Sequence, residues 1–243
     1  VALYKVAEEG GETGSVKSFV QATRVAVEQA ERALNSGGHI SGITTGIDSI
    51  NAKIGGLHDS DLMILAGRPG MGKTSLATNI AFNAAKRWMR DAEDGIPPEK
   101  SAGAKVAFFS LEMSADQLAT RVLAEQSGIV AEKIRSGKIA ASEFQKFARA
   151  AGDLESLPLF IDDTPGLTIA ALRTRARRLK RRHDIGFVIV DYLQLLQGSR
   201  NVGRRVATGC QVVAQQRGLY RAVVVALVPL AQVAVAQAIR PRR

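Results

Sequence analysis

A glycine-rich run between residues 67 and 74 constrains the fold of this chain more than any other feature. It reads Gly67-Arg68-Pro69-Gly70-Met71-Gly72-Lys73-Thr74 and fits the pattern G-x-x-x-x-G-K-[ST]. The apolar residues before it predict a strand, and the residues from Lys73 onward predict a helix. Glycines allow backbone N–H groups to turn inward around phosphates, and the helix N-terminus adds its positive dipole end. The run therefore predicts a phosphate-binding loop between a strand and a helix.

The chemistry of such a loop predicts ATP and Mg²⁺ as cofactors. Lys73 would neutralise the β- and γ-phosphates during catalysis, and the Thr74 hydroxyl would ligate Mg²⁺. A chance match in a glycine-rich turn is the alternative, and the flanking strand and helix argue against it. The predicted nucleotide-binding residues are Gly67, Arg68, Pro69, Gly70, Met71, Gly72, Lys73, Thr74 and Ser75.

A second metal ligand is expected at the end of a neighbouring strand, because a phosphate-binding loop of this kind needs a carboxylate to hold Mg²⁺ through water. Asp191 closes the apolar run Phe187–Asp191. Ligands bind at the carboxyl ends of strands in open parallel sheets, which favours the metal role over the alternative of a simple turn cap.

Glu112 is the candidate for orienting the water that attacks the γ-phosphate. It follows the apolar run that starts at Val106, so it would project at the same sheet edge as the phosphate loop. Its structural alternative is a first-turn acid beside the helix that Ser114 opens. Asp162 and Asp163 also end an apolar run and compete for the catalytic role.

Apolar runs alternate with helical patterns along most of the chain. Runs that are apolar throughout are typical of a parallel sheet covered by helices on both faces, so the fold class is α/β. Ser114 and Gln117 predict a capped helix to about Gln126, and Thr168 predicts one over Ile169–Arg182. The predicted strands are Leu62–Ala66, Val106–Leu111, Leu159–Asp162 and Phe187–Asp191, with Val223–Val228 a candidate fifth.

An amphipathic helix is predicted over residues 18–34, ahead of this domain. Val20, Val27 and Leu34 recur along one line, and Gly37-Gly38 follows as a stop. A Gly/Ser/Thr-rich stretch, Asn35 to Gly46, then separates the helix from the domain. The apolar line would dock on a neighbouring subunit or fold back on its own domain. The domain boundary is therefore placed between a linker segment, 1–41, and an ATPase domain, 42–243.

Composition excludes some functions. With one cysteine, Cys210, the chain cannot form an internal disulfide, and a reducing, intracellular setting is expected. Residues 1–10 lack the features of a signal peptide, so we expect a cytoplasmic protein. The net charge of +10 does not by itself indicate a DNA-binding face, because residues 192–243 hold eight arginines and no acidic residue. The arginine-rich helix 169–182 is interpreted as a solvated face.

A series of motifs between residues 42 and about 199 resembles the DnaB helicase family in wording and order. The motifs are Gly42-Ile-Thr-Thr-Gly-Ile-Asp48, Gly55-Gly-Leu57 with Asp61-Leu62, Arg68 to Thr74, Phe109-Ser-Leu-Glu-Met113 with Gln117-Leu118, Ile161-Asp-Asp163 with Gly166-Leu-Thr168, and Asp191-Tyr-Leu-Gln-Leu195. The resemblance implies a RecA-like P-loop fold with a mostly parallel twisted sheet, preceded by a linker helix. It also implies Glu112 as the catalytic glutamate and Asp191 as the Walker B aspartate.

The same resemblance implies a replicative helicase motor at the bacterial replication fork. ATP hydrolysis would drive translocation on single-stranded DNA and duplex unwinding by a homohexameric ring. The partners that the resemblance implies are primase and a helicase loader. It does not imply an association with a membrane. Two alternatives stay open. One is another RecA-like ring ATPase, and the other is a ring scaffold that binds nucleotide without turnover.

From about Asn201 onward the resemblance fails. The family would have a strand ending in a Ser-Gln pair that senses the γ-phosphate, whereas this chain reads Ala226-Leu-Val-Pro-Leu230, with Gln232 a displaced substitute. We hypothesise that residues 201–243 are misassigned, for instance by a frame change in GC-rich coding DNA; intact-protein mass spectrometry tests this. The nearly apolar run 222–239 is interpreted as containing a buried strand near 223–228, because Pro229 and two glutamines argue against a membrane span.

Overall fold

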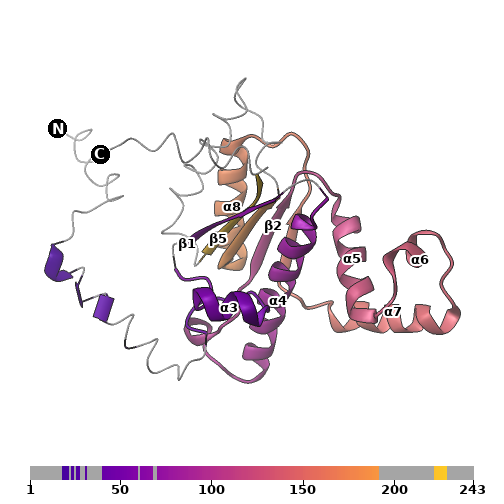
Figure 1. Cartoon of the computed structure of the whole chain (residues 1–243), viewed down its shortest axis with the longest axis horizontal. Coiled ribbons are helices and arrows are strands. Elements are labelled where there is room, and N and C mark those ends of the chain that lie inside the picture. The colour runs from indigo at the N-terminus through magenta and orange to yellow at the C-terminus, as the bar shows by residue number, and fades with distance from the viewer. Residues whose placement is uncertain are drawn as a thin grey trace. The chain divides into compact units, whose positions relative to one another are not determined.

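The computed structural model describes residues 18–21, 23–24, 26–27, 31, 40–59, 61–67, 70–191 and 222–228 of the chain (Figure 1). The chain divides into two compact units, Val1–Ser41 and Gly42–Arg243. In the first unit, every described residue from 19 to 31 is helical, as the sequence predicts. Within that unit nothing described covers Phe19, Val20 and Val27, which are 85%, 78% and 52% exposed.

The second unit is built on a five-stranded sheet in which all neighbouring strands are parallel. Its order is β1-β5-β4-β2-β3. The strands are β1 (Asp61–Ala66), β2 (Val106–Ser110), β3 (Leu159–Asp162), β4 (Phe187–Asp191) and β5 (Ala222–Val228). The candidate fifth strand is thus confirmed, and it separates β1 from β4. Strand β2 ends at Ser110, one residue earlier than predicted, because the chain then turns toward Glu112.

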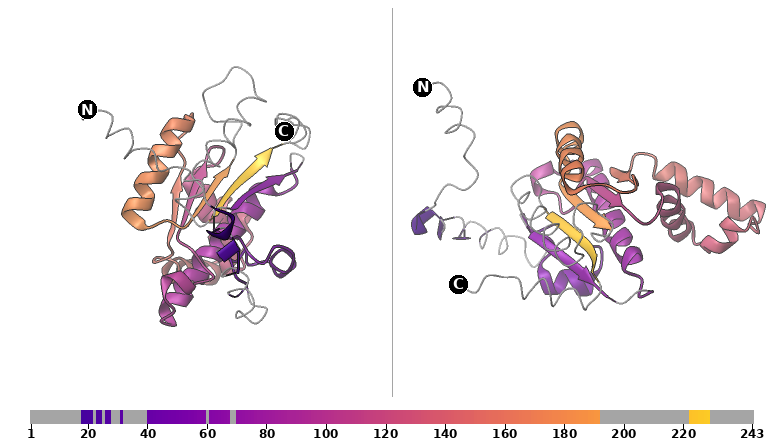
Figure 2. Two further views of the ribbon diagram at one scale, coloured as in Figure 1. Left: turned by 90° about the vertical axis from the view of Figure 1, so that its left-hand side faces the viewer. Right: turned by 90° about the horizontal axis from the view of Figure 1, so that it is seen from above.

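Side chains alternate between two cores, one on each face of the sheet. On β2, Val106 and Phe108 face the core that contains Ala77, Ile80 and Ala84 of α4 (Lys73–Glu93). Ala107 and Phe109 face the other core, with Leu172 and Ala176 of α8 (Ile169–His183). The two helices accordingly cover opposite faces (Figure 2). This two-sided burial explains why the central strands are apolar throughout.

Three further helices extend from the sheet beside α4. They are α5 (Ala115–Ser127), α6 (Ala131–Arg135) and α7 (Ala141–Asp153), and α7 contacts α5 and runs crosswise to it, away from the strands (Figure 1). The Ser114 hydroxyl accepts from the Gln117 N–H at 3.4 Å, and the Thr168 hydroxyl accepts from the Ala171 N–H at 3.2 Å. Ser114 and Thr168 therefore cap the N-termini of α5 and α8, as the sequence predicts.

The segment before β1 is attached to the core through α3 (Asp48–Ile54) and a short bridge. Ile43 pairs with Leu57, and both side chains are buried. Asn51 of α3 accepts from the Thr45 N–H at 2.9 Å and from its hydroxyl at 2.7 Å. Asn83 of α4 donates to the Thr45 carbonyl at 3.3 Å, so this segment is anchored to the phosphate-loop helix.

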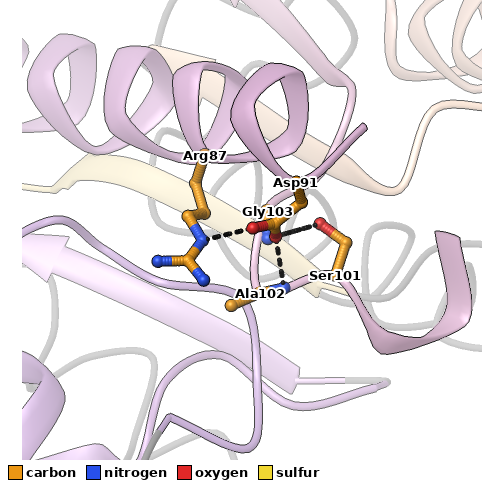
Figure 3. A network of polar contacts seen from close by, with 5 residues as sticks. All are labelled: Arg87, Asp91, Ser101, Ala102 and Gly103. Carbon is orange, nitrogen blue, oxygen red and sulfur yellow. Dashed lines mark hydrogen bonds and ion pairs between the residues drawn. The ribbon is translucent and has the colours of Figure 1, made fainter. Parts of the chain in front are cut away.

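A buried carboxylate anchors the other end of α4 (Figure 3). Asp91, only 1% exposed, accepts from Arg87 Nε at 2.7 Å, from Ser101 Oγ at 2.7 Å and from the Ala102 N–H at 3.0 Å. Gly103 follows where a Cβ would come within 2.0 Å of a backbone nitrogen of α4, so only glycine fits. These contacts hold the connection into β2 against α4.

Candidate nucleotide-binding site

The phosphate loop joins β1 to α4, as predicted. Gly70 and Gly72 have φ values of 78° and 76°, a left-handed conformation that favours glycine. A Cβ at either position would meet nothing within 4 Å, so these glycines are required by backbone conformation rather than by crowding. Arg68 and Pro69 lie outside the described residues. Met71 is described and is 70% exposed.

Helix α4 begins without a capping side chain. Gly72 is its N-cap, and no acidic residue lies in its first turn. Such an end presents unpaired N–H groups and a positive dipole, which together favour a bound anion. Lys73, Thr74 and Ser75 occupy this first turn and are half-buried. The stem of Lys73 passes Gly67, where a Cβ would lie 3.4 Å from Lys73 Cδ.

Asp191 lies at the carboxyl end of β4 and is fully buried. Neither carboxylate oxygen has a hydrogen-bond partner among the described residues. Burial raises the pKa of Asp191 to about 6, helped by the negative charge of Glu112. The nearby Thr74 hydroxyl and Lys73 ammonium oppose this increase in pKa. A buried carboxylate whose oxygens lack well-formed hydrogen bonds is costly unless a cation offsets its charge, so this site would fit a hydrated divalent ion.

Glu112 is brought to the same place by the strand next to β4. Ser110 pairs with Asp191 across the sheet, and the Leu111 N–H donates to the Asp191 carbonyl at 2.6 Å. The buried Ser110 hydroxyl donates to the Met113 carbonyl at 2.6 Å and accepts from the Met113 N–H at 3.3 Å. This tight turn holds Glu112 at the sheet edge with its side chain exposed.

The competing carboxylates are both engaged elsewhere. Arg175 Nη1 lies 2.9 Å from each oxygen of Asp162. Burial pushes the pKa of Asp162 upward, but hydrogen bonds from Arg175 and Thr164 outweigh it and leave the pKa below its usual value. Asp163 accepts from the Ala115 N–H at 2.8 Å, at the start of α5. Both residues therefore accept well-formed hydrogen bonds from structural partners, whereas neither oxygen of Asp191 does.

Sequence reasoning missed one residue of this site. Arg121 of α5 donates from Nη1 to Ser75 Oγ at 3.1 Å, and its positive charge partly offsets the increase in the pKa of Asp191. The sequence around Arg121 hints at this contact, because Arg121 lies next to Leu118 and Val122, apolar residues of the same helix that the structure buries. A basic residue next to the apolar line of a helix indicates a polar partner.

Other sequence predictions fall outside what the structure describes, including residues 192–195 and Gln232. Among the described residues, no three His, Cys, Asp or Glu side chains cluster as a metal site. Mg²⁺ would therefore rely on Thr74, Asp191, water and the nucleotide itself. None of the described helices is long and apolar enough to cross a membrane.

Solved structures share this architecture. A DnaB-like replicative helicase, studied with its primase interactions, superposes with a TM-score of 0.70 at 24% identity, covering 93% of this chain and 52% of that one. A second solved structure, of an ATPase domain, superposes with a TM-score of 0.71 at 24% identity, covering 88% of this chain and 71% of that one. Both likenesses support the RecA-like α/β fold.

Sequence relatives are closer. The replicative DNA helicase DnaB of Rickettsia bellii is 38% identical over 238 residues, 98% of this chain and 47% of that protein. The DnaB of Geobacillus stearothermophilus is 34% identical over 221 residues, 90% of this chain and 46% of that protein. The chain thus spans about half the length of the curated relatives it matches. Because the model of the DnaB-like helicase C-terminal domain matches residues 42–243, the chain belongs to that family.

Proposed function

We propose that this chain is the ATP-hydrolysing motor domain of a replicative DNA helicase. One observation carries the proposal. The Asp191 carboxylate is buried and has no hydrogen bond of good geometry among the described residues. It lies at the sheet edge where the end of β4 meets the first turn of α4 and the turn after β2. A hydrated Mg²⁺ ion bound together with the nucleotide would supply the positive charge that offsets this carboxylate.

Each residue of the site then has a defined role. The N–H groups of the loop and of the first turn of α4 bind phosphate oxygens, and Lys73 neutralises their charge. Thr74 would ligate Mg²⁺ directly, and Asp191 would hold it through water. Glu112 would orient the attacking water, because its side chain is exposed beside Asp191 while Asp162 and Asp163 are engaged.

The proposed assembly is a homohexameric ring that moves on single-stranded DNA in the bacterial cytoplasm. Membership of the DnaB-like family supports this proposal. Primase is a proposed partner because the structural relative was studied with primase, and a helicase loader is proposed from the family. The exposed Phe19, Val20 and Val27 suit docking of the linker helix on a neighbouring subunit.

Glu112→Gln tests the catalytic assignment. The substitution keeps Lys73, Thr74 and Asp191 and removes only the group that orients water, so ATP should still bind. Phosphate release should fall by about 100-fold or more. Near-normal turnover would transfer the role to Asp162 or Asp163. If the unmodified chain binds ATP but releases no phosphate with single-stranded DNA present, a nucleotide-binding scaffold is the better interpretation.

A further inference from the structure

Helices α4 and α5 are joined by a row of polar contacts that begins at the nucleotide site. Ser75, Asn79 and Lys86 lie on one side of α4, since their spacings of four and seven residues repeat with the helix. Ser75 accepts from Arg121 at 3.1 Å, and Lys86 donates to Gln126 Oε1 at 2.9 Å. Between them, Asn79 reaches Glu125 Oε2 at 2.9 Å when its amide nitrogen faces that carboxylate.

The first contact in this row differs from the others in its position. Ser75 follows Thr74 directly, in the turn of α4 that would hold the phosphates. Arg121 belongs to the helix that begins three residues after Glu112, and the start of that helix is bound to Asp163 through the Ala115 N–H at 2.8 Å. The Arg121–Ser75 contact therefore ties the phosphate-binding turn to the segment that carries Glu112.

We propose that Arg121 is a positioning residue for ATP hydrolysis, which sets the phosphate-binding turn of α4 relative to Glu112 through its hydrogen bond to Ser75. The inference rests on the proposed ATPase function. Water attack requires the γ-phosphate and the water-orienting carboxylate to be aligned, and a displacement of about 1 Å costs on the order of 100-fold in rate. Nucleotide binding does not need this alignment, since Lys73, Thr74 and the N–H groups of the loop before α4 would contact the phosphates without Glu112.

The experiment compares Arg121→Ala with a matched control, Lys86→Ala, in the full 243-residue chain. Both variants remove one polar contact between the same two helices, but Lys86 lies about three turns from the phosphates. Arg121→Ala should lower kcat for ATP about 10- to 100-fold, with KM and the Kd for a fluorescent ADP analogue changed less than about 3-fold. Lys86→Ala should keep kcat, KM and Kd within about 2-fold of the unmodified chain.

Two additional variants connect the effect to this hydrogen bond. Arg121→Lys keeps a hydrogen-bond donor and a positive charge on a shorter side chain. Its kcat should therefore lie between those of the unmodified chain and Arg121→Ala. If thermal melting shows that Arg121→Ala does not fold, Arg121→Lys replaces it as the test variant. Ser75→Ala removes the acceptor, so the losses in kcat of Ser75→Ala and Arg121→Ala should not add in the double variant.

Hydrogen exchange gives a readout that does not depend on turnover. Without nucleotide, the amides of residues 73–78 should exchange faster in Arg121→Ala than in Lys86→Ala or the unmodified chain. If the unmodified chain releases no phosphate, the proposed function fails, while exchange still tests the contact. Unchanged kcat in Arg121→Ala, an increased KM with unchanged kcat, or an equal loss in Lys86→Ala would each overturn the positioning role.

Discussion

Replacing Asp191 with asparagine should make the stability of the metal-free chain less sensitive to pH. Asp191 is fully buried, and its pKa is raised from the ordinary 3.8 to about 6, mainly by burial and secondarily by Glu112. Between these two values the folded chain binds more protons than the unfolded chain. Stability contributed by the protonated form is therefore lost as pH rises through that window. Asparagine has a similar shape and no charge at any pH in this range.

The size of the effect follows from the difference between the two pKa values. A rise from 3.8 to about 6 corresponds to about 3 kcal/mol of unfolding free energy. Burying the asparagine amide has its own cost, but that cost does not depend on pH. Because the unfolded-state carboxyl is already about half ionised at pH 4, the stability of Asp191→Asn minus that of the unmodified chain should increase by about 2 kcal/mol between pH 4 and pH 7, and stay level above that.

The assay is urea denaturation at several pH values in EDTA, so that no divalent ion masks the carboxylate. Titrating groups that do not interact with Asp191 are common to both chains and cancel in the difference. Asp184→Asn is the matched control, because hydrogen bonding to Lys180 lowers the pKa of Asp184 and its pH dependence should have the opposite sign. Adding Mg²⁺ and ADP at pH 7 should then stabilise the unmodified chain more than Asp191→Asn. A pH-independent difference between Asp191→Asn and the unmodified chain would refute the reasoning.

Three other changes have defined outcomes. Lys73→Ala should weaken ATP binding by about 100-fold or more at unchanged circular dichroism, because the loop N–H groups alone cannot neutralise a triphosphate; tight binding measured by calorimetry would contradict this. Asp91→Ala leaves the Ser101 hydroxyl and the Ala102 N–H without their acceptor, so urea denaturation should show a loss of about 3 kcal/mol in the free energy of unfolding. Arg87→Ala should lose less, because the Arg87 side chain is 50% exposed. Removing residues 1–40 should weaken the oligomer while nucleotide binding persists, and an unchanged oligomer in light scattering would mean that the helix packs on its own domain.

Local patterns in the sequence were enough to locate the phosphate loop and most strands. The loop needs glycines at two left-handed positions between a strand and a helix, and this requirement is visible in eight consecutive residues. Strands β3 and β4 were predicted to the residue, because their apolar runs end at charged residues. The roles of Lys73, Glu112 and Asp191 remain predictions, although the structure does place these residues together.

Contacts between distant segments were decided only by the tertiary structure. The sequence does not say that β5 inserts between β1 and β4, because strand order depends on which elements pair after the chain closes long loops. Nor does the sequence separate Glu112 from Asp162, which ends the apolar strand β3; the difference is the Arg175 side chain that reaches Asp162 from α8. Arg121 is the clearest case: its place beside the apolar positions of α5 suggests a polar partner, but nothing in the sequence identifies that partner as Ser75, 46 residues earlier.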